Sequence, residues 1–269
     1  MVQKTATTKR QIAQSKPLLV GMVLIVLCIG VGAGAGVYVA NYLFAQAPEP
    51  IPPSVSVPRR LSKAPVVSEP DAVIPPIVDG MVPEIQRLET KQPVAFLTID
   101  DGGVRQPDFP QYLRQNNLKA TLFLANAFIE KDPKYFRAFV RDGHVIENHT
   151  LGHDLAMSTK PIAYQQQQIC GMSDQLVEYY GRRPALFRAP GGRYTDITRR
   201  AAQQCNMRAI VGWKATIDYG VMRYQEGTML KPGDIVLLHF RDGFKTDIDV
   251  YIKETSRAGL RTELLEDWL

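Results

Sequence analysis

From residue 80 onward, short apolar runs alternate with longer amphipathic stretches. The apolar runs, rich in Val, Ile, Leu and Phe and typical of buried strands, cover residues 94–100, 120–125, 144–149, 186–189, 208–213 and 234–239. Stretches with helical periodicity lie between them, at residues 107–116, 134–142, 163–180, 196–205 and 246–258. Continuous apolar strands that alternate with helices form parallel sheets covered by helices. The pattern therefore predicts an α/β domain, built on either an open doubly wound sheet or a barrel.

One long apolar run stands apart near the N-terminus. Residues 17–40 carry no charge and consist mostly of Leu, Val, Ile, Gly and Ala. As a helix this run would span about 36 Å, enough to cross a hydrocarbon core of about 30 Å. Residues 1–16 carry four positive charges and no acid. We therefore predict a basic cytoplasmic segment at 1–16, a transmembrane anchor at 17–42 and an extracytoplasmic remainder. The alternative is a cleavable signal peptide, for which Ala45-Gln46-Ala47 fits the cleavage pattern.

Proline dominates the segment that follows the apolar run. Residues 46–79 contain nine prolines and no apolar periodicity, which predicts a semi-rigid spacer over residues 43–79. The remaining residues, 80–269, are numerous enough for a substantial core and form the predicted catalytic domain. This part carries 25 Lys and Arg against 23 Asp and Glu, so no basic surface indicates a nucleic-acid partner.

Cysteine usage excludes two further classes of protein. Three cysteines in 269 residues are too few for a small disulfide-stapled scaffold or for an all-cysteine zinc module. Cys170 and Cys205 lie in predicted helices, away from the strand ends, and have no predicted catalytic role. They are able to pair in an exported domain, but the sequence does not show whether their Cα atoms are close enough.

Polar residues that suggest chemistry stand where the predicted strands end. In both parallel architectures the carboxyl ends of the strands gather at one edge, which is where ligands bind. Three of the four histidines of the chain lie at such ends. The residues concerned are Asp100, Asp101, His149, His153, Arg188, Asp218 and His239, with Gly191 and Gly192 just after Arg188.

The spacing of His149 and His153 suggests a metal site. On a helical turn, residues i and i+4 share a face, so both imidazoles reach one ion. Two histidines and one carboxylate commonly bind Zn²⁺ or another divalent ion and leave positions open for water and substrate. The alternative is a pair of hydrated loop histidines.

Asp100 and Asp101 supply the carboxylate. Two adjacent carboxylates at one strand tip repel each other unless a cation or a shared proton relieves the repulsion. Consecutive strand residues point in opposite directions. We therefore expect Asp101 to bind the metal and Asp100 to accept a proton. The alternative is an Asx turn or a helix cap that leads into the following glycines.

The remaining strand ends offer supporting groups. Arg188 is expected to orient Asp100 through its guanidinium fork, unless it is an ordinary surface arginine. Gly191 permits close backbone approach, so an amide N–H there is able to bind an oxyanion. Asp218 and His239 form a plausible acid pair, in which the carboxylate orients the imidazole that donates a proton.

Five segments, in this order, resemble the NodB-homology family of polysaccharide deacetylases, also called carbohydrate esterase family four. The resemblance covers roughly residues 92–265. The matching segments are Thr98-Ile99-Asp100-Asp101-Gly102, His149-Thr150-Leu151-Gly152-His153, Arg188-Ala189-Pro190, Asp218-Tyr219 and Leu237-Leu238-His239.

The resemblance implies a distorted (β/α) barrel with fewer than eight units and a metal-dependent hydrolysis of acetyl groups on polysaccharide. It makes Asp100 the general base, oriented by Arg188, and His239 the general acid, tuned by Asp218. The residues that it assigns to one divalent ion, usually zinc, are Asp101, His149 and His153.

Three positions depart from the family pattern. Ile99 replaces an aromatic residue, Gly191 stands where many members have an aromatic beside the oxyanion-binding amide, and Tyr219 stands where Trp is usual. Gly191 and Tyr219 are the residues that we expect to contact the substrate or its oxyanion. Their departures affect the expected substrate preference and leave the type of reaction unchanged.

The expected function is removal of acetyl groups from a peptidoglycan- or chitin-like polysaccharide of N-acetylglucosamine type, at the cell membrane. An O-acetyl esterase of the acetyl-xylan type, or a small-amide hydrolase, is an alternative on the same fold. A glycan-binding wall protein that has lost catalysis is another alternative, and it would lack a base, a metal ligand or an acid. The sequence leaves the polymer and the oligomeric state open.

Overall fold

The computed structural model describes residues 69–269 of the chain. The predicted cytoplasmic segment and membrane anchor, and most of the predicted spacer, lie outside the described residues. Within residues 69–269, no helix combines the length and the apolar character needed to cross a membrane. Residues 69–77 form neither helix nor strand, and Ala72 and Ile74 pack against the core of the domain.

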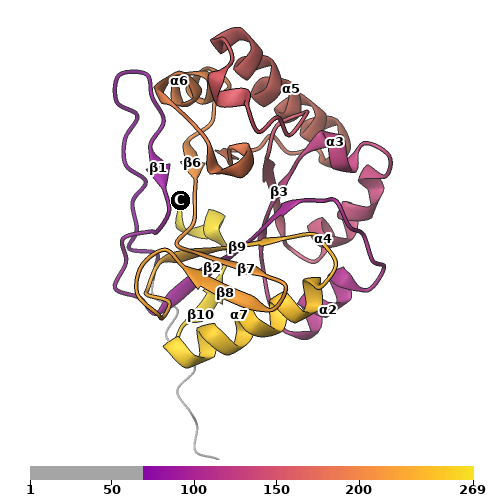
Figure 1. Ribbon diagram of the computed structural model, residues 1–269, viewed down its shortest axis with the longest axis vertical. Helices are drawn as coiled ribbons and strands as arrows, with labels where there is room; N and C mark the ends of the chain where they lie inside the picture. The colour runs from indigo at the N-terminus through magenta and orange to yellow at the C-terminus, as the bar shows by residue number, and fades with distance from the viewer. Residues whose placement is uncertain (1–68) are drawn as a thin grey trace, which may run out of the picture. The chain divides into compact units, whose positions relative to one another are not determined.

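A single sheet organises the domain (Figure 1). Its strands follow the order β1-β6-β5-β4-β3-β2-β9-β7-β8, and every neighbouring pair is parallel except β7 with β8. β2 pairs with β9 along one edge, and with β10 and then β3 along the other. The strands are β1 (Glu84–Ile85), β2 (Val94–Asp101), β3 (Thr121–Leu124), β4 (Val145–Asn148), β5 (Leu186–Phe187), β6 (Ala209–Val211), β7 (Ala215–Asp218), β8 (Val221–Tyr224), β9 (Asp234–His239) and β10 (Arg261–Glu263).

The sheet curves back on itself near its first strand. Just after β1, the Leu88 N–H donates to the Gly233 carbonyl (2.9 Å) and the Ile235 N–H donates to the Gln86 carbonyl (3.4 Å). The segment after β1 thus contacts the start of β9, although the outer strands β1 and β8 do not pair within the described part of the chain. The predicted α/β class is confirmed, and the sheet is a distorted half-barrel.

Helices cover the outside of the curved sheet (Figure 1). α2 and α7 pack together through the stacked rings of Phe109 and Phe244, whose centroids are 4.2 Å apart. The helices are α2 (Phe109–Gln115), α3 (Asn126–Ile129), α4 (Arg137–Arg141), α5 (Ile162–Tyr180), α6 (Asp196–Gln204) and α7 (Phe244–Ala258), with 3-10 turns η1 (Pro133–Phe136), η2 (Met157–Thr159), η3 (Pro190–Gly192) and η4 (Leu265–Trp268).

Apolar side chains also fill the concave face of the sheet. Phe96 of β2 and Phe123 of β3 lie in one buried cluster with Trp268 of the C-terminal turn η4. The Phe96 and Trp268 rings meet edge to face at 5.7 Å. Because β10 and η4 join the sheet at the start of β2, they close the amino end of the half-barrel. The carboxyl ends of the strands remain for the polar site.

A disulfide joins Cys170 of α5 to Cys205 at the end of α6, so the pairing that the sequence left open is present. The two residues are 35 positions apart. A crosslink of this kind typically contributes about 2–4 kcal/mol by restricting the unfolded chain. We expect a Cys170→Ala, Cys205→Ala variant to lose that amount in urea unfolding. Reductant should lower the stability of the wild type and leave the variant unchanged; equal stability of the two proteins would contradict this expectation.

Two carboxyl groups lie close together in the interior, on β4 and η4. Glu147 accepts hydrogen bonds from the Arg182 guanidinium (2.8 Å) and the Leu186 N–H (2.7 Å). Glu266 accepts a hydrogen bond from the Thr121 hydroxyl (2.7 Å). Burial, followed by the charge of Glu147, raises the pKa of Glu266 to about 8.

This pair predicts a pH-dependent stability. Because the folded state holds the Glu266 proton more tightly than the unfolded chain, the free energy of unfolding should fall as pH rises from about 4.5 through 8. A Glu266→Gln variant cannot ionise there and should show a flatter pH profile. Urea unfolding across this range measures both proteins, and parallel profiles would contradict the assignment.

Candidate metal centre

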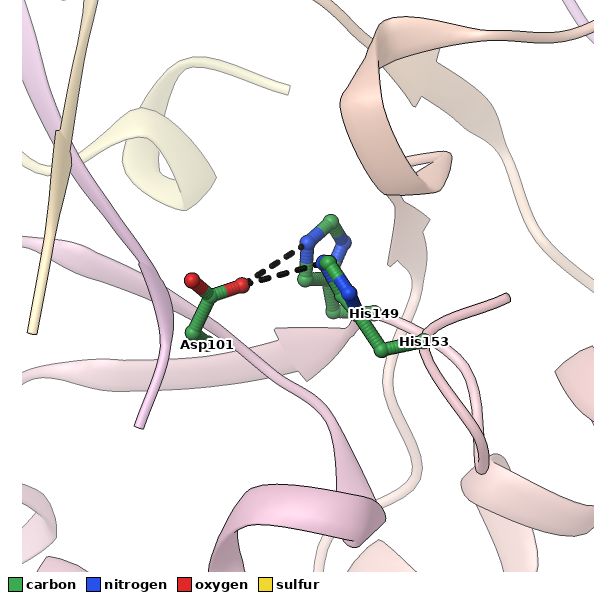
Figure 2. Close-up of side chains that lie close together, drawn as sticks. All are labelled: Asp101, His149 and His153. Carbon is green, nitrogen blue, oxygen red and sulfur yellow. Dashed lines mark ion pairs between the residues drawn. The ribbon is translucent and has the colours of Figure 1, made fainter. Parts of the chain in front are cut away.

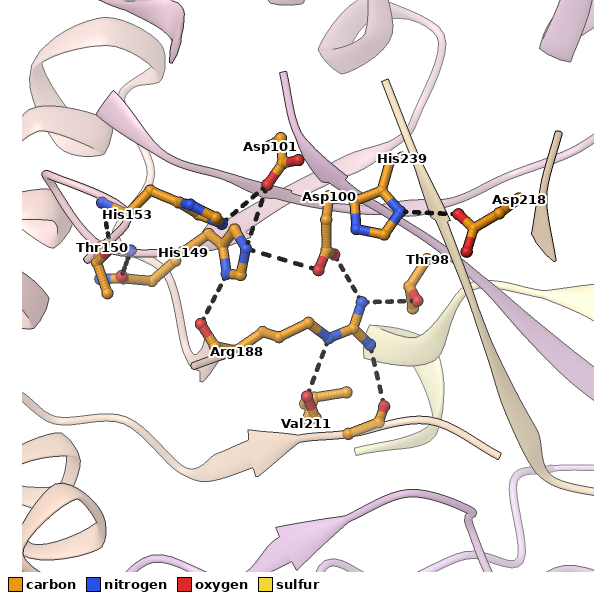
Figure 3. Close-up of polar contacts among 12 residues, drawn as sticks. Thr98, Asp100, Asp101, His149, Thr150, His153, Arg188, Val211, Asp218 and His239 are labelled. Atoms are coloured by element: carbon orange, nitrogen blue, oxygen red, sulfur yellow. Dashed lines mark hydrogen bonds and ion pairs between the residues drawn. The ribbon is translucent and has the colours of Figure 1, made fainter. Parts of the chain in front are cut away.

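The predicted site residues meet at the carboxyl edge of the sheet (Figure 3). Asp100 and Asp101 end β2, His149 follows β4, Arg188 follows β5 and His239 ends β9. The parallel register places Asp100 directly opposite His239. Side chains that are far apart in the sequence therefore converge because neighbouring parallel strands end together.

Asp101, His149 and His153 bring three possible metal ligands together (Figure 2). Asp101 Oδ1 lies 3.5 Å from His149 Nε2 and 3.1 Å from His153 Nε2. All three ligand atoms lie within 4.8 Å of one another. Asp101 Oδ1 is buried and has no hydrogen-bond partner among the described residues. A buried, unsatisfied carboxylate oxygen facing two imidazole nitrogens fits a divalent cation.

The orientation of the His149 ring supports this interpretation. His149 is buried, and its Nδ1 lies 2.8 Å from the Arg188 carbonyl oxygen. A carbonyl oxygen only accepts hydrogen bonds, so Nδ1 carries the hydrogen and Nε2 is the nitrogen that faces Asp101. Metal-binding histidines are commonly oriented in this way by a hydrogen bond from the second ring nitrogen.

The electrostatics of the cluster favour a positive charge at its centre. Burial acts to lower the pKa of His149, but the nearby charges of Asp100 and Asp101 raise it overall. Burial acts to raise the pKa of Asp101, but the neighbouring imidazoles of His149 and His153 hold it well below its usual range. Asp101, His149 and His153 would hold a divalent ion here in place of a proton.

The segment that carries the two histidines is a loop, so the prediction of a helical turn is wrong. Thr150 and His153 have left-handed backbone conformations, with φ of 75° and 51°. The Asn148 side chain accepts from the Thr150 N–H (2.9 Å), and the Thr150 hydroxyl accepts from the His153 N–H (3.1 Å). These local hydrogen bonds bend the loop so that both imidazoles face Asp101.

The strand alternation expected at Asp100 and Asp101 also fails. Asp101 has a φ of 77°, and Gly102, with a φ of 88°, continues the turn. A Cβ atom at Gly102 would lie 2.6 Å from the Ile129 side chain, so this position requires glycine. As a result Asp100 Oδ2 also approaches His149 Nε2, to 3.6 Å, and the two carboxylates do not point in opposite directions.

Arg188 is completely buried, which excludes the alternative of a surface arginine. Its Nη1 donates to Asp100 Oδ1 (2.7 Å). Its Nε and Nη2 donate to the carbonyl oxygens of Val211 (2.9 Å) and Gly212 (3.0 Å). The guanidinium is thus fixed from three sides, and it holds the Asp100 carboxylate in one position, as the sequence predicts.

Sequence reasoning missed Thr98 and Phe123, which complete the setting of Arg188. The Thr98 hydroxyl accepts from Arg188 Nη1 (2.9 Å) and donates to the Val236 carbonyl (2.8 Å). The guanidinium carbon lies 4.2 Å from the centre of the Phe123 ring. Thr98 carries a signal that points to this role, because it interrupts the apolar run that leads to Asp100.

His239 and Asp218 lie next to each other without a direct hydrogen bond. His239 Nδ1 is 3.6 Å from Asp218 Oδ1, which is too long for one. Arg241, which sequence reasoning missed, lies closer to the same oxygen at 2.9 Å. Burial lowers the pKa of His239. Asp218 is therefore shared between an arginine and the histidine that it was expected to tune.

The two predicted substrate-contacting residues lie in different settings. Gly191 belongs to the turn η3 and has a φ of 61°; a Cβ there would lie 3.3 Å from Leu155. Tyr219 is 72% exposed and, with Gly220, forms the tight turn between β7 and β8. Tyr219 is thus available to a large substrate from the surface, whereas Gly191 lies on the loop that follows Arg188.

Fold and site together define an α/β half-barrel with two histidines and one carboxylate gathered as a candidate metal site at its carboxyl edge. Residues 87–210 match the polysaccharide deacetylase family. An uncharacterized protein of Streptomyces coelicolor is 39% identical over 170 residues, which cover 61% of this chain and 63% of that protein. A peptidoglycan-N-acetylglucosamine deacetylase of Bacillus cereus is 26% identical over 161 residues, or 54% of this chain and 72% of the relative.

A solved structure shares the fold. A CE4 family pseudoenzyme from Bacillus anthracis superposes with a TM-score of 0.59 at 19% identity, covering 69% of this chain and 68% of its own. Residues 87–210 are thus similar to the polysaccharide deacetylase family, and the predicted resemblance is confirmed at this level. The match spans less than two thirds of the length of the Streptomyces coelicolor relative.

Proposed function

We propose that this chain is a metal-dependent hydrolase that removes acetyl groups from N-acetylglucosamine units of a cell-wall or related polysaccharide. The observation that carries the proposal is the buried Asp101 Oδ1, which faces His149 and His153 and has no hydrogen-bond partner within residues 69–269. The relative from Bacillus cereus, named for its action on peptidoglycan, supports the substrate class.

The proposed ligands of the ion are Asp101, His149 and His153, and zinc is the ion that this donor set favours. A divalent ion held there would polarise the acetyl carbonyl of the substrate and lower the pKa of a water molecule. Three protein ligands leave coordination positions open for substrate and water.

The surrounding residues supply the proton transfers. Asp100, held by Arg188, accepts a proton from the attacking water. The backbone N–H of Gly191 is proposed to donate to the oxygen that becomes negative. His239 donates a proton to the nitrogen of the sugar as the carbon–nitrogen bond breaks, so the products are acetate and a free amine.

Two alternative functions make different predictions. An O-acetyl esterase would use the same residues on an ester. A glycan-binding protein without catalysis would share only the fold, which the Bacillus anthracis pseudoenzyme also has. Here the residues proposed as the base, the three ligands and the acid are all present and close together. Acetate release should be compared on N-acetylglucosamine oligomers and acetylated xylan. Preference for xylan would replace the proposed substrate, and no release from either would favour a binding protein.

We also propose that the domain is exported and anchored by the N-terminal apolar run. The Cys170–Cys205 disulfide supports this proposal, because disulfides persist in oxidising compartments. Protease added to intact cells should then remove the domain, and a protected domain or a mature N-terminus at Pro48 would contradict the anchored arrangement.

A further inference from the structure

A cavity of about 110 Å³, open to solvent on one side, lies beside the candidate metal centre, between β1, β6 and the turn η3. Because β1 runs parallel to β6, the cavity lies at the same edge of the sheet as the catalytic candidates. Its wall includes Gly191 and the backbone of Gly212. Arg188 donates to Asp100 with Nη1 and to the Gly212 carbonyl with Nη2 (3.0 Å), so one side chain contacts both the proposed base and the cavity wall.

Two glycines shape the wall of this cavity. A Cβ at Gly192 would lie 2.7 Å from the ring of Trp213, and a Cβ at Gly212 would lie 2.8 Å from Gln86 Cγ. The absence of these side chains lets Trp213 and Gln86 pack directly against the backbone. The wall of the cavity is therefore closely packed on both sides of the loop that follows β6.

The chemistry of the lining is that of a site for a positively charged sugar. Trp213 and Tyr194 line the cavity with aromatic side chains, a type that binds cations and the apolar faces of sugars, and the Arg188 guanidinium carbon lies 5.6 Å from the Trp213 ring centre. Glu84 also lines the cavity and accepts from Gln86 Nε2 (2.5 Å). Burial and the neighbouring Glu84 carboxylate raise the pKa of the Tyr194 hydroxyl. No lysine or arginine of residues 69–269 forms an ion pair with Glu84. The carboxylate is thus held in place and lacks a cationic partner in this part of the chain.

We propose that the cavity of Glu84, Gln86, Tyr194, Gly192 and Trp213 is a second sugar subsite, which binds a glucosamine unit with a free, protonated amine. This inference rests on the function proposed above, since that reaction leaves such amines on the same strand. Glu84 pairs with the ammonium group, and the aromatic rings contact the sugar. The enzyme therefore prefers strands that are already partly deacetylated and extends their deacetylated stretches.

Intrinsic fluorescence of the Asp100→Asn variant, which is expected to bind without hydrolysing, tests the subsite without turnover, with Glu84→Gln and Glu226→Gln made in the same background. The chain contains two tryptophans, and Trp268 is 4% exposed inside the core, so a ligand-induced change reports on Trp213. Titration of the full chain with glucosamine oligomers should give a saturable change that weakens with salt, and N-acetylglucosamine oligomers should bind more weakly. Glu84→Gln should lower the affinity for glucosamine oligomers at least about tenfold, because a charge-assisted contact is lost.

Glu226→Gln is the matched control, because Glu226 is half exposed and pairs with Lys214 (2.6 Å) outside the cavity. This variant should bind as its Asp100→Asn parent does. Equal affinity for acetylated and deacetylated oligomers, or unchanged affinity in Glu84→Gln, would overturn the subsite. Loss of acetate release in the wild type, with binding retained, would instead overturn the proposed function, so the two failures are distinguishable.

Discussion

An Asp100→Asn variant is expected to lose at least about 10²-fold in kcat and to keep its metal. The neutral amide of this variant cannot accept the proton of the attacking water, whereas the three proposed ligands remain. Because the proton moves only in the transition state, KM should change little. Acetate-release kinetics and elemental analysis of the purified variant measure the two quantities.

Asp101→Asn is the matched comparison. A neutral amide is a poorer ligand for a dication than a carboxylate, so this variant should lose metal as well as activity. Both variants must be measured, because Asp100 and Asp101 lie at nearly the same distance from His149 Nε2, 3.6 and 3.5 Å. If Asp100→Asn loses its metal and Asp101→Asn keeps it, the two roles are reversed.

Of the substitutions proposed for this chain, Arg188→Gln is expected to lower the free energy of unfolding the most. Arg188 and Asp100 form a buried ion pair (2.7 Å), and removal of one partner leaves an uncompensated buried charge. Such changes cost about 3–5 kcal/mol. The carbonyl oxygens of Val211 and Gly212 lose their donors as well. Urea unfolding should show a correspondingly lower midpoint, and activity should fall because Asp100 is no longer held.

Arg183→Gln provides the control for this prediction. Arg183 and Asp174 form an exposed pair (2.5 Å), and such pairs contribute about 0–1 kcal/mol. In an Asp100→Asn background, Arg188→Gln should change the free energy of unfolding by a different amount than it does in the wild type, because the two residues are coupled. If the Arg188→Gln variant is no less stable than the Arg183→Gln variant, the buried pair of Arg188 and Asp100 does not contribute the stability proposed for it.

The strands and helices with strong apolar patterns could be predicted from the sequence. The run at 234–239 coincides with β9, and the helix expected at 163–180 is α5, Ile162–Tyr180. These elements are buried, so their hydrophobic periodicity is selected directly by packing. The convergence of polar residues at the strand ends followed from the parallel arrangement, which the same pattern predicts.

The edge elements could not be predicted in this way. β1 has two residues, β10 is the polar segment Arg261–Glu263, and β8 is half exposed along Val221–Tyr224. Such short strands pair through backbone hydrogen bonds and bury too few side chains to leave an apolar pattern. The cavity beside the candidate metal centre was therefore not foreseen, because β1 supplies one of its walls.

The identities of the candidate ligands followed from residue type and spacing, but their geometry did not. The left-handed conformations of Asp101, Thr150 and His153 bring the three ligands together, and none of these residues is glycine. Non-glycine residues in this conformation are uncommon, so sequence reasoning assumed a regular strand and a helical turn. The contact of Arg241 with Asp218 depends on the path of the chain after β9, for which the sequence offers no periodic signal.

Removal and restoration of the metal tests the central claim most directly. The full chain should be treated with a chelator, its metal content determined by elemental analysis, and acetate release from N-acetylglucosamine oligomers measured before and after addition of zinc. We predict that metal-free protein releases no acetate and that zinc restores the activity. Full activity in protein shown to be free of metal would contradict the proposed role of Asp101, His149 and His153.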